Sequence, residues 1–236
     1  MGLGKFITFE GGEGAGKSTQ AHLLLRRLNR LRVEAEITRE PGGTPVAEAI
    51  RAVLLDASLS PRSASSELLL FYAARADHLQ TRILPALRAG SWVICDRFND
   101  STRAYQGSVD QNQKNLLESL ERLVVGSDRP DLTIILDVDP EIGMRRAIRR
   151  TYDAGGRSPL FIPEQLAFSF APDRFEALDI EFHRRVRSAF LEIARAEPDR
   201  CVVIDSCGGI SRVSDLVWAA VLQRFAGSLS GAAAPI

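Results

Sequence analysis

The sequence predicts an α/β fold, a three-layer sandwich in which a parallel sheet of about five strands is flanked by helices and a lid segment is added. Two observations support this prediction. Short apolar runs without polar alternation recur along the chain and helical patterns separate them, which is typical of parallel strands buried on both faces. The length of 236 residues and the 45% of apolar residues also suit one large α/β domain with a full core.

The first third of the chain begins with a strand from Lys5 to Glu10, where a short apolar run ends at glycines. A helix is expected from Lys17 onward, because four leucines then recur at helical spacing. Residues 34–38 read as a second strand, followed by the turn REPGGT. The Thr44-Pro45 pair combines an N-cap with a favourable first helical residue, so it opens a helix through about Leu55.

The middle third has helical periodicity from Ser65 to Arg88, and Pro85 is expected to bend or end that helix. The segment SWVICDRF reads as an apolar strand that ends in a charged pair. Residues Gln111 to Val125 form an amphipathic helix pattern, and LTIILDVD is another continuous buried strand.

In the last third, helices are expected over Pro140–Arg150, Arg174–Glu197 and Ile210–Phe225, with the strand CVVID before the last of them. One domain therefore covers residues 1–226, and 227–236 are expected to be a disordered tail. The lid covers about 146–173. Within it, Thr151 to Asp173 has three prolines, two glycines and no clean period, and such a long irregular stretch is usually a functional lid or disordered.

Composition restricts the function. Lysine plus arginine equals aspartate plus glutamate at 30 each, which argues against a nucleic-acid polymer or a membrane surface as a partner. The cysteines Cys95, Cys201 and Cys207 lack a metal-site spacing, and Cys95 and Cys201, which lie in apolar runs, are expected to pack in the core. No apolar stretch approaches the ~20 residues of a membrane span, and no signal peptide is recognisable, so a cytoplasmic protein is expected.

Residues Gly11 to Ser18 match G-x-x-x-x-G-K-[ST] in full, after a strand and before a helix. The glycines let backbone N–H groups turn toward the phosphates of ATP, and the helix N-terminus adds its partial positive charge. Lys17 would reach the β- and γ-phosphates, and the Ser18 hydroxyl would bind Mg²⁺. The residues expected to hold ATP are Gly11, Gly12, Glu13, Gly14, Ala15, Gly16, Lys17, Ser18 and Thr19.

A carboxylate for Mg²⁺ should end a neighbouring strand. Asp96 follows WVIC and fits this role, either directly or through water, while Asp137 after LTIIL is the alternative. Arg97 comes next, at the carboxyl end of the sheet where open α/β folds bind ligands. Its guanidinium suits bidentate recognition of phosphate.

Several phosphate-loop classes are excluded by missing motifs. The guanine-reading N-K-x-D of GTPases is absent, and so are the H-R-D and D-F-G of protein kinases. No device for coupling hydrolysis to a motor partner is recognisable. A small phosphotransferase whose acceptor binds near Arg97 remains. A regulatory protein that binds nucleotide without catalysis is the alternative, and intact Lys17, Ser18, Asp96 and Arg97 favour the enzyme.

Several segments together resemble the thymidylate kinase family in its bacterial form, within the P-loop nucleoside monophosphate kinase superfamily. They are FEGGEGAGKSTQ, TREPGGT, LLLFYAARADHL, DRFNDSTRAYQG, RPDLTIILDVDPEIGMRRA and DRFEALDIEFHRRVRSAFLEIA. They keep the family's order over roughly residues 5 to 205. The resemblance implies ATP- and Mg²⁺-dependent phosphorylation of dTMP to dTDP on a homodimer, with another monophosphate acceptor such as dUMP as the runner-up.

The resemblance also implies roles for single residues. Position on a helix alone would place Phe71 in the core, but Phe71 corresponds to an aromatic residue of the family that stacks on thymine. Arg75, one helical turn on, matches an arginine that contacts a base carbonyl. Thr102 takes the place of a polar residue near the base edge, and Tyr105 that of an aromatic packed under the deoxyribose, where a 2′-hydroxyl would clash.

Around the acceptor phosphate, Arg97 and Arg39 match two arginines of the family, and Glu13 matches an acid near the sugar 3′-hydroxyl. Gln106 is expected near the site without a defined role. Some relatives carry a basic residue at the position of Gly14, so in this chain the missing charge is expected from the lid.

The lid arginines Arg146 and Arg150 match the family's G-L-x-R-x-x-x-R and are one helical turn apart, which makes them candidates for stabilising the transferred phosphoryl group. For any single one, a solvated helix face is the alternative. The segment PLFIPEQLAFSF makes this lid longer and more apolar than the usual one.

Overall fold

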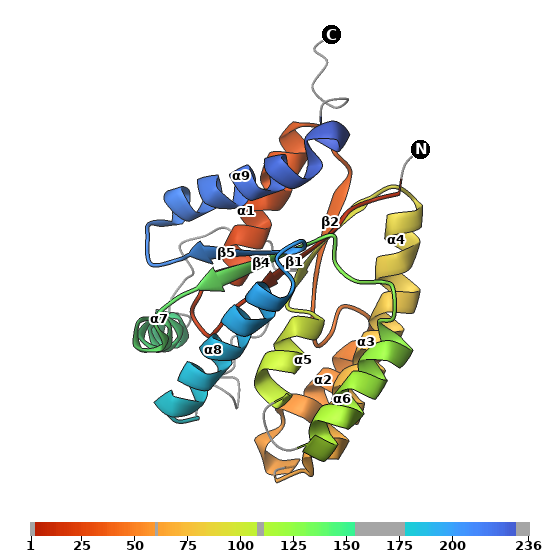
Figure 1. Ribbon diagram of the computed structural model, residues 1–236, viewed down its shortest axis with the longest axis vertical. Helices are drawn as coiled ribbons and strands as arrows, with labels where there is room; N and C mark the ends of the chain where they lie inside the picture. Colours follow the sequence, from red (N-terminus) through yellow and green to blue (C-terminus); the bar gives the residue numbers. More distant parts are fainter. Residues whose placement is uncertain (1–2, 60, 108–110, 154–177, 230–236) are drawn as a thin grey trace.

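Five parallel strands form the sheet at the centre of the computed structural model, in the order β2-β3-β1-β4-β5, which confirms the predicted fold class (Figure 1). The structure describes residues 3–59, 61–107, 111–153 and 178–229. The strands are β1 (Phe6–Glu10), β2 (Ala35–Arg39), β3 (Trp92–Asp96), β4 (Leu132–Asp137) and β5 (Cys201–Asp205). Because β1 is central and pairs with both β3 and β4, the loop that follows it lies beside the carboxyl ends of two other strands.

The helices are α1 (Lys17–Arg30), α2 (Pro45–Leu55), α3 (Ala64–His78), α4 (Leu84–Arg88), α5 (Asn99–Gln106), α6 (Gln111–Val124), α7 (Pro140–Asp153), α8 (Ile180–Ala196) and α9 (Ile210–Leu229). A short 3-10 helix, η1 (Ala57–Leu59), follows α2, and a π-helical turn, η2 (Leu79–Ile83), joins α3 to α4. None of the described helices is long and apolar enough to cross a membrane.

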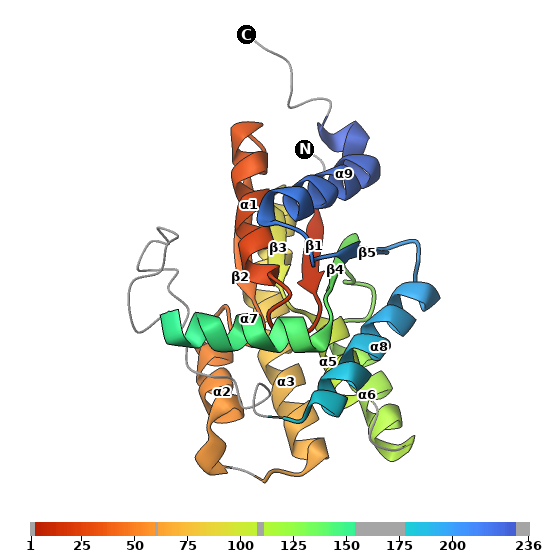
Figure 2. The same ribbon diagram turned by 90° about the vertical axis from the view of Figure 1, so that its left-hand side faces the viewer.

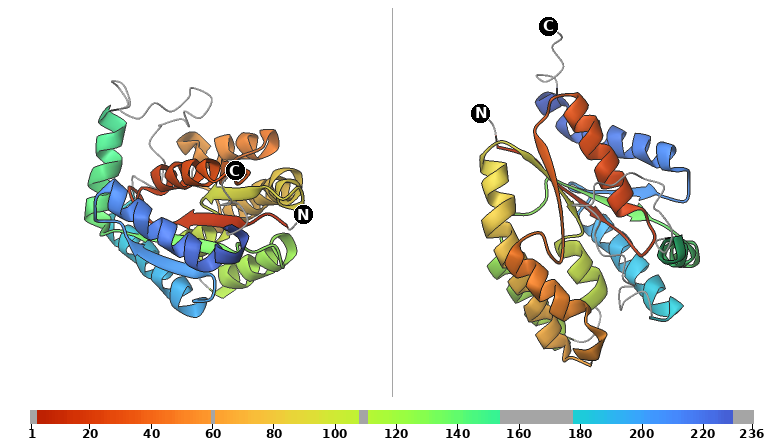
Figure 3. Two further views of the ribbon diagram at one scale, coloured as in Figure 1. Left: turned by 90° about the horizontal axis from the view of Figure 1, so that it is seen from above. Right: turned by 180° about the vertical axis from the view of Figure 1, so that it is seen from behind.

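Different helices cover the two faces of the sheet. One face packs against α1 and α9, which lie side by side when the molecule is seen from behind (Figure 3). The other face packs against α3, α4 and α6 on one half and against α5 and α8 on the other half. Alternate residues of the strands serve the two layers: Ile94 in β3 faces α1 and α9, while its neighbours Val93 and Cys95 face α3. This burial on both faces explains why the central strands β1, β3 and β4 lack polar alternation.

Local signals set the helix starts. The Thr44 hydroxyl accepts the Ala47 N–H at 3.2 Å, with Pro45 as the first residue of α2. The Ser63 hydroxyl accepts the Ser66 N–H at 3.1 Å, and an Asp179 carboxylate oxygen accepts the Phe182 N–H at 2.7 Å. These bonds satisfy amide donors that the first turn of a helix leaves unpaired.

The helical segment predicted from Ser65 to Arg88 is present as α3, η2 and α4, and Pro85 does not end it. The π-helical turn before the proline supplies a Leu84 N–H to Leu79 O bond. A wider turn removes the clash that a proline ring makes with the carbonyl four residues back. The helix expected from Arg174 begins at Ile180, and residues 174–177 lie outside the described residues.

The C-terminal boundary also moves. Residues 227–229, expected in the disordered tail, form the last turn of α9, because Leu229 packs into the core beneath α1 and is 5% exposed. Residues 230–236 are outside the described part of the chain. Helix α5, which the sequence patterns did not predict, carries much of the site described next.

Candidate active site

The glycine-rich loop Gly11–Gly16 leaves the central strand β1 and enters α1 at Lys17. Gly11, with φ 131°, lies so close to β4 that a Cβ there would be 2.3 Å from the Leu136 carbonyl oxygen, so only glycine fits. The Lys17 ammonium group folds back over the loop and donates to the carbonyls of Gly11 at 3.1 Å and Gly12 at 2.8 Å. Burial, with a smaller contribution from the Arg97 charge, lowers the pKa of Lys17 to about 8.

Ser18 and Asp96 meet beside this loop. Asp96 ends β3 and is paired in register with Phe9 of β1, and its Oδ2 accepts a hydrogen bond from the Ser18 hydroxyl. A hydroxyl and a carboxylate next to a phosphate loop are hard oxygen ligands of the kind that Mg²⁺ prefers. The alternative residue, Asp137, is engaged elsewhere, because Arg187 donates to both of its oxygens at 2.6 and 2.8 Å.

A cavity that is open to solvent lies next to the phosphate loop. Seven of the eight residues expected to bind the acceptor line it: Glu13, Phe71, Arg75, Arg97, Thr102, Tyr105 and Gln106. The cavity therefore brings together residues from the loop, from α3 and from α5.

Arg39 is the eighth expected residue, and the structure does not place it in the cavity lining. It ends β2 and donates from Nη2 to both carboxylate oxygens of Glu48 at 3.1 and 3.0 Å. The charge of Arg39, together with the Gly43 N–H, outweighs the effect of burial and lowers the pKa of Glu48. Glu48 thus anchors α2 to the end of β2.

Arg97 is the centre of the polar wall of the cavity. Its backbone is left-handed, with φ 69°, a conformation that costs free energy outside glycine and is found most often at functional sites. The guanidinium donates to the Glu13 carboxylate at 2.5 Å and to the Gly11 carbonyl at 3.2 Å, and it lies 5.1 Å from the centre of the Tyr105 ring. Burial alone would lower the pKa of Arg97, but the neighbouring acidic groups, Glu13 first among them, together outweigh it and the pKa is raised.

Glu13 also accepts a hydrogen bond from the Tyr105 hydroxyl at 2.6 Å. The carboxylate therefore joins the phosphate loop to α5 through two donors. Burial raises the pKa of Tyr105 well above its ordinary value, so the phenol stays protonated and able to donate.

Arg75 is 2% exposed and lies at the floor of the cavity. It donates from Nε to Glu40 at 2.8 Å, from Nη1 to the Asn99 side chain at 3.4 Å, and from Nη2 to Thr102 at 2.9 Å and to the Phe98 carbonyl at 3.2 Å. These bonds use four of the five donors of a guanidinium and leave one Nη1 hydrogen for a ligand.

Phe71 and Gln106 complete the wall. Phe71 is half-buried on α3 and lines the cavity, so a ring face can meet a planar ligand. Gln106 donates to Glu67 at 3.1 Å and thereby connects the end of α5 to α3.

The lid residues are only partly within the described structure. Helix α7 lies across the start of α1 and is seen lengthwise in Figure 2, and it packs directly on the phosphate loop through Gly143, whose added Cβ would be 2.3 Å from the Glu13 carbonyl oxygen. Arg146 donates to the carbonyls of Ser206 at 3.0 Å and Cys207 at 3.4 Å, in the loop between β5 and α9. The backbone of Arg150 lies in α7, but its side chain and residues 154–173 lie outside the described structure.

Sequence patterns missed the residues that support this cavity from behind. Glu40 holds Arg75 and also accepts from His78 Nδ1 at 3.1 Å, and His78 Nε2 lies 2.7 Å from the Thr38 hydroxyl. Glu10, at the end of β1, accepts the Phe98 N–H at 2.8 Å and the Ser101 hydroxyl at 2.5 Å. The available signal was an acid at the end of one predicted strand, Glu10, and an acid in the turn directly after the next predicted strand, Glu40. A charge that is buried there is unfavourable unless it has partners.

Comparisons with known proteins agree with this geometry. The family model described as thymidylate kinase matches residues 9–217. The chain is 50% identical over 222 residues to the thymidylate kinase of Nitrobacter hamburgensis, covering 94% of this chain and 89% of the relative. It is 51% identical to that of Rhodopseudomonas palustris strain BisB18, covering 94% and 90%. The crystal structure of thymidylate kinase from Ehrlichia chaffeensis superposes with a TM-score of 0.68 at 35% identity, covering 93% of this chain and 99% of that one.

Proposed function

This chain belongs to the thymidylate kinase family, and we propose that dTMP binds in the cavity beside its phosphate loop and accepts the γ-phosphoryl group of ATP there. The enzyme phosphorylates dTMP with ATP, giving dTDP and ADP, with Mg²⁺ as cofactor. The observation that carries the proposed placement is the position of Arg97, which donates to the Gly11 carbonyl of the phosphate loop and also lines the cavity.

On the donor side, the loop from Gly11 to Gly16, with Ala15 within it, binds the phosphates through backbone N–H groups, and Thr19 follows in the first turn of α1. Lys17, once charged, orients the β- and γ-phosphates. Ser18 and Asp96 would hold Mg²⁺, which neutralises phosphate charge when it is bound.

On the acceptor side, Arg97 orients the dTMP phosphate, and Glu13 both orients Arg97 and approaches the sugar 3′-hydroxyl. Tyr105 packs under the deoxyribose and leaves no room for a 2′-hydroxyl. In the base subsite, Phe71 stacks on thymine, while Arg75 and Thr102 read the polar edge of the base from the cavity floor. Holding both anionic substrates in line is the main catalytic contribution, because phosphoryl transfer needs little proton chemistry.

Three assignments extend this proposal. Gln106 supports the acceptor pocket through Glu67, and Arg39 contributes to the field around the acceptor phosphate from the end of β2. Of the two lid arginines, we favour Arg150 for the transferred phosphoryl group, since Arg146 already donates to two carbonyls. We place the enzyme in the cytoplasm, where ATP and dTMP are available together.

A homodimer is also proposed. Helices α2 and α3 pack along each other and leave large apolar side chains on their outer surfaces, with Val46, Val53 and Leu69 exposed by 54%, 40% and 51%. A second copy would remove this area from water. The substitution Leu69→Glu should shift the molar mass in light scattering toward the monomer, whereas Leu222→Glu on exposed α9 should not.

The test of the proposed function is ADP release from ATP and Mg²⁺ with dTMP, dUMP, the ribo-analogue of dTMP, dCMP and dGMP in parallel. Turnover should be confined mainly to dTMP. Arg150→Ala should lower kcat far more than KM, and Arg146→Ala should have the smaller effect on kcat. Equal turnover of all five acceptors would exclude the proposed roles of the cavity residues.

A further inference from the structure

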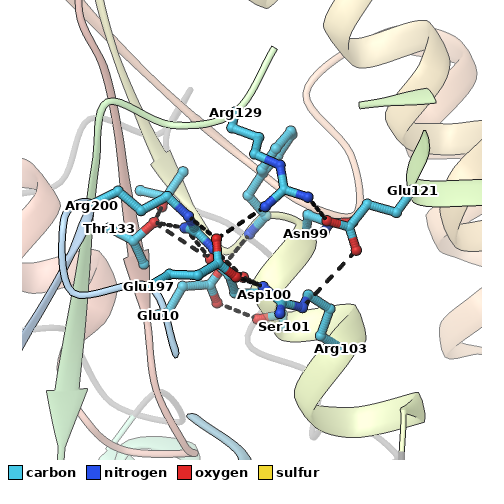
Figure 4. A network of polar contacts seen from close by, with 12 residues as sticks. Glu10, Asn99, Asp100, Ser101, Arg103, Glu121, Arg129, Thr133, Glu197 and Arg200 are labelled. Atoms are coloured by element: carbon cyan, nitrogen blue, oxygen red, sulfur yellow. Dashed lines mark hydrogen bonds and ion pairs between the residues drawn. The ribbon is translucent and has the colours of Figure 1, made fainter. Parts of the chain in front are cut away.

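A closed network of charged side chains surrounds the first turn of α5 (Figure 4). Three arginines and three carboxylates alternate in it, so the network is neutral as a whole: Arg103, Arg129, Arg200, Asp100, Glu121 and Glu197. The proposed function uses none of these six residues.

Asp100 is the most deeply buried member, with 2% exposure. Arg200, just before β5, grips its carboxylate with both Nη atoms, at 2.7 Å to Oδ2 and 2.9 Å to Oδ1. Arg103 adds a third donor to Oδ1 at 2.9 Å. A two-pronged arginine–carboxylate contact fixes direction as well as distance.

The hydrogen bonds of Arg200 continue to β1, the strand that leads into the phosphate loop. Arg200 Nη1 also donates to the Thr133 hydroxyl in β4 at 2.7 Å, and that hydroxyl lies 2.9 Å from the Thr8 hydroxyl in β1. Asp100 is thereby tied through one arginine to β4, β5 and β1 together.

Helix α5 depends on such outside support. It has only eight residues, no side chain caps its N-terminus, and only the N-cap residue Phe98 separates it from the left-handed Arg97. A helix this short is not stable alone in water. Tertiary contacts must therefore set its position.

Three consecutive residues of α5 fix it in three directions. Asp100 is held by Arg200, Ser101 donates to Glu10 of β1, and Thr102 accepts from Arg75 of α3. One turn further on, Tyr105 reaches the cavity, so its place depends on these contacts at the first turn.

We propose that Asp100 and Arg200 are positioning residues for the acceptor: their paired contact sets the rotation of α5 and hence the place of Tyr105 under the sugar. This inference rests on the proposed role of Tyr105. None of the hydrogen bonds described above for Asp100 and Arg200 involves the loop from Gly11 to Gly16. The pair should therefore affect the selection and alignment of the acceptor rather than the binding of ATP.

The test replaces Asp100 by asparagine and, in a second variant, Arg200 by lysine. Asp100→Asn keeps the size of the side chain and removes its charge, whereas Arg200→Lys keeps the charge and removes the fork. Arg129→Gln is the matched control, because Arg129 also has two carboxylate partners in the network, at 3.0 Å to Glu197 and 2.7 Å to Glu121, and neither lies in α5.

The readout is the ratio of kcat/KM for dTMP to kcat/KM for its ribo-analogue, measured on one preparation of each variant. This ratio does not depend on the fraction of folded enzyme. It should fall by about 10-fold in both Asp100→Asn and Arg200→Lys, within the range that a small misplacement of a positioning group produces. It should stay at the wild-type value in Arg129→Gln, and KM for ATP should change less than twofold in all three.

Tyr105→Ala separates the possible failures. If Tyr105→Ala lowers the ratio while Asp100→Asn and Arg200→Lys leave it unchanged, the positioning role of the pair is wrong and the role of Tyr105 stands. If Tyr105→Ala leaves the ratio unchanged as well, the proposed sugar contact itself fails. A fall of the same size in Arg129→Gln would also overturn the inference, because loosening of the network as a whole would then be sufficient.

Discussion

Replacing Glu10 by glutamine should make the enzyme more stable at alkaline pH. Glu10 is fully buried at the end of β1, where its oxygens accept from the Phe98 N–H and the Ser101 hydroxyl. Glutamine can keep both contacts, because its oxygen accepts from the amide and its NH₂ group donates to the serine oxygen. The substitution therefore removes a charge and leaves the packing in place.

The pKa of Glu10 gives the size of the effect. Burial first, and the nearby Asp100 charge second, raise it from the ordinary 4.5 to about 7. Between these two pH values the folded state binds more protons than the unfolded state, so stability falls as pH rises through this window. The difference corresponds to about 3 kcal/mol of unfolding free energy, which the glutamine variant does not lose.

The assay is urea unfolding of wild type and Glu10→Gln at several pH values from 5 to 8.5. The difference in unfolding free energy should be about 1 kcal/mol or less at pH 5 and should grow to about 3 kcal/mol in favour of the variant above pH 7. Glu118→Gln, at an exposed position of α6, controls for the loss of one formal charge. A difference that stays constant with pH, or that grows in favour of wild type, would refute the reasoning.

Three further outcomes are expected around the phosphate loop. Lys17 has a pKa of about 8 and binds phosphate in its charged form, so ATP affinity measured by calorimetry should fall as pH rises through 8; an affinity independent of pH would contradict this. Asp96→Asn should raise the Mg²⁺ concentration needed for half-maximal rate by about 10-fold or more, while Asp137→Asn should leave it unchanged. Gly143→Ala would place a Cβ 2.3 Å from the Glu13 carbonyl oxygen, so it should raise KM for ATP; an unchanged KM would show that α7 moves freely from the loop.

The parts of the fold that sequence patterns predicted are those whose cause is local. The three central strands β1, β3 and β4 were found because each is a short run buried on both faces. The phosphate loop was found because its glycines, lysine and serine lie within one short segment. The start of α2 at Pro45 was also predictable, since the cap and the helix are neighbours in the chain.

Helix α5 was missed because its causes are distant in the sequence. Its buried side chains are largely polar, including Asp100 and Thr102, so it shows no apolar stripe. Their partners Arg200 and Arg75 lie 100 and 27 residues away. No pattern within the segment could reveal that these contacts would replace a hydrophobic face.

The same limit applies to the acceptor cavity. Phe71 and Tyr105 were assigned from resemblance, whereas Glu40 and Glu10, which hold the arginines and the α5 turn behind them, were not singled out. The role of a buried acid can be recognised only from the groups that donate hydrogen bonds to it. These donors come from other elements: Arg75 of α3 donates to Glu40, and Ser101 of α5 donates to Glu10.

The contact between Gly14 and Gly143 links two features that looked independent in the sequence. Gly14 takes the position where some relatives carry a basic residue, and an added Cβ there would lie 2.0 Å from the Gly143 carbonyl oxygen. The reverse also holds, since a Cβ at Gly143 would collide with the Glu13 carbonyl. A basic side chain at position 14 therefore requires α7 to sit farther from the loop. Because α7 bears the lid arginines, the glycine that removes a positive charge from the loop also brings the helix carrying other positive charges into direct contact with it.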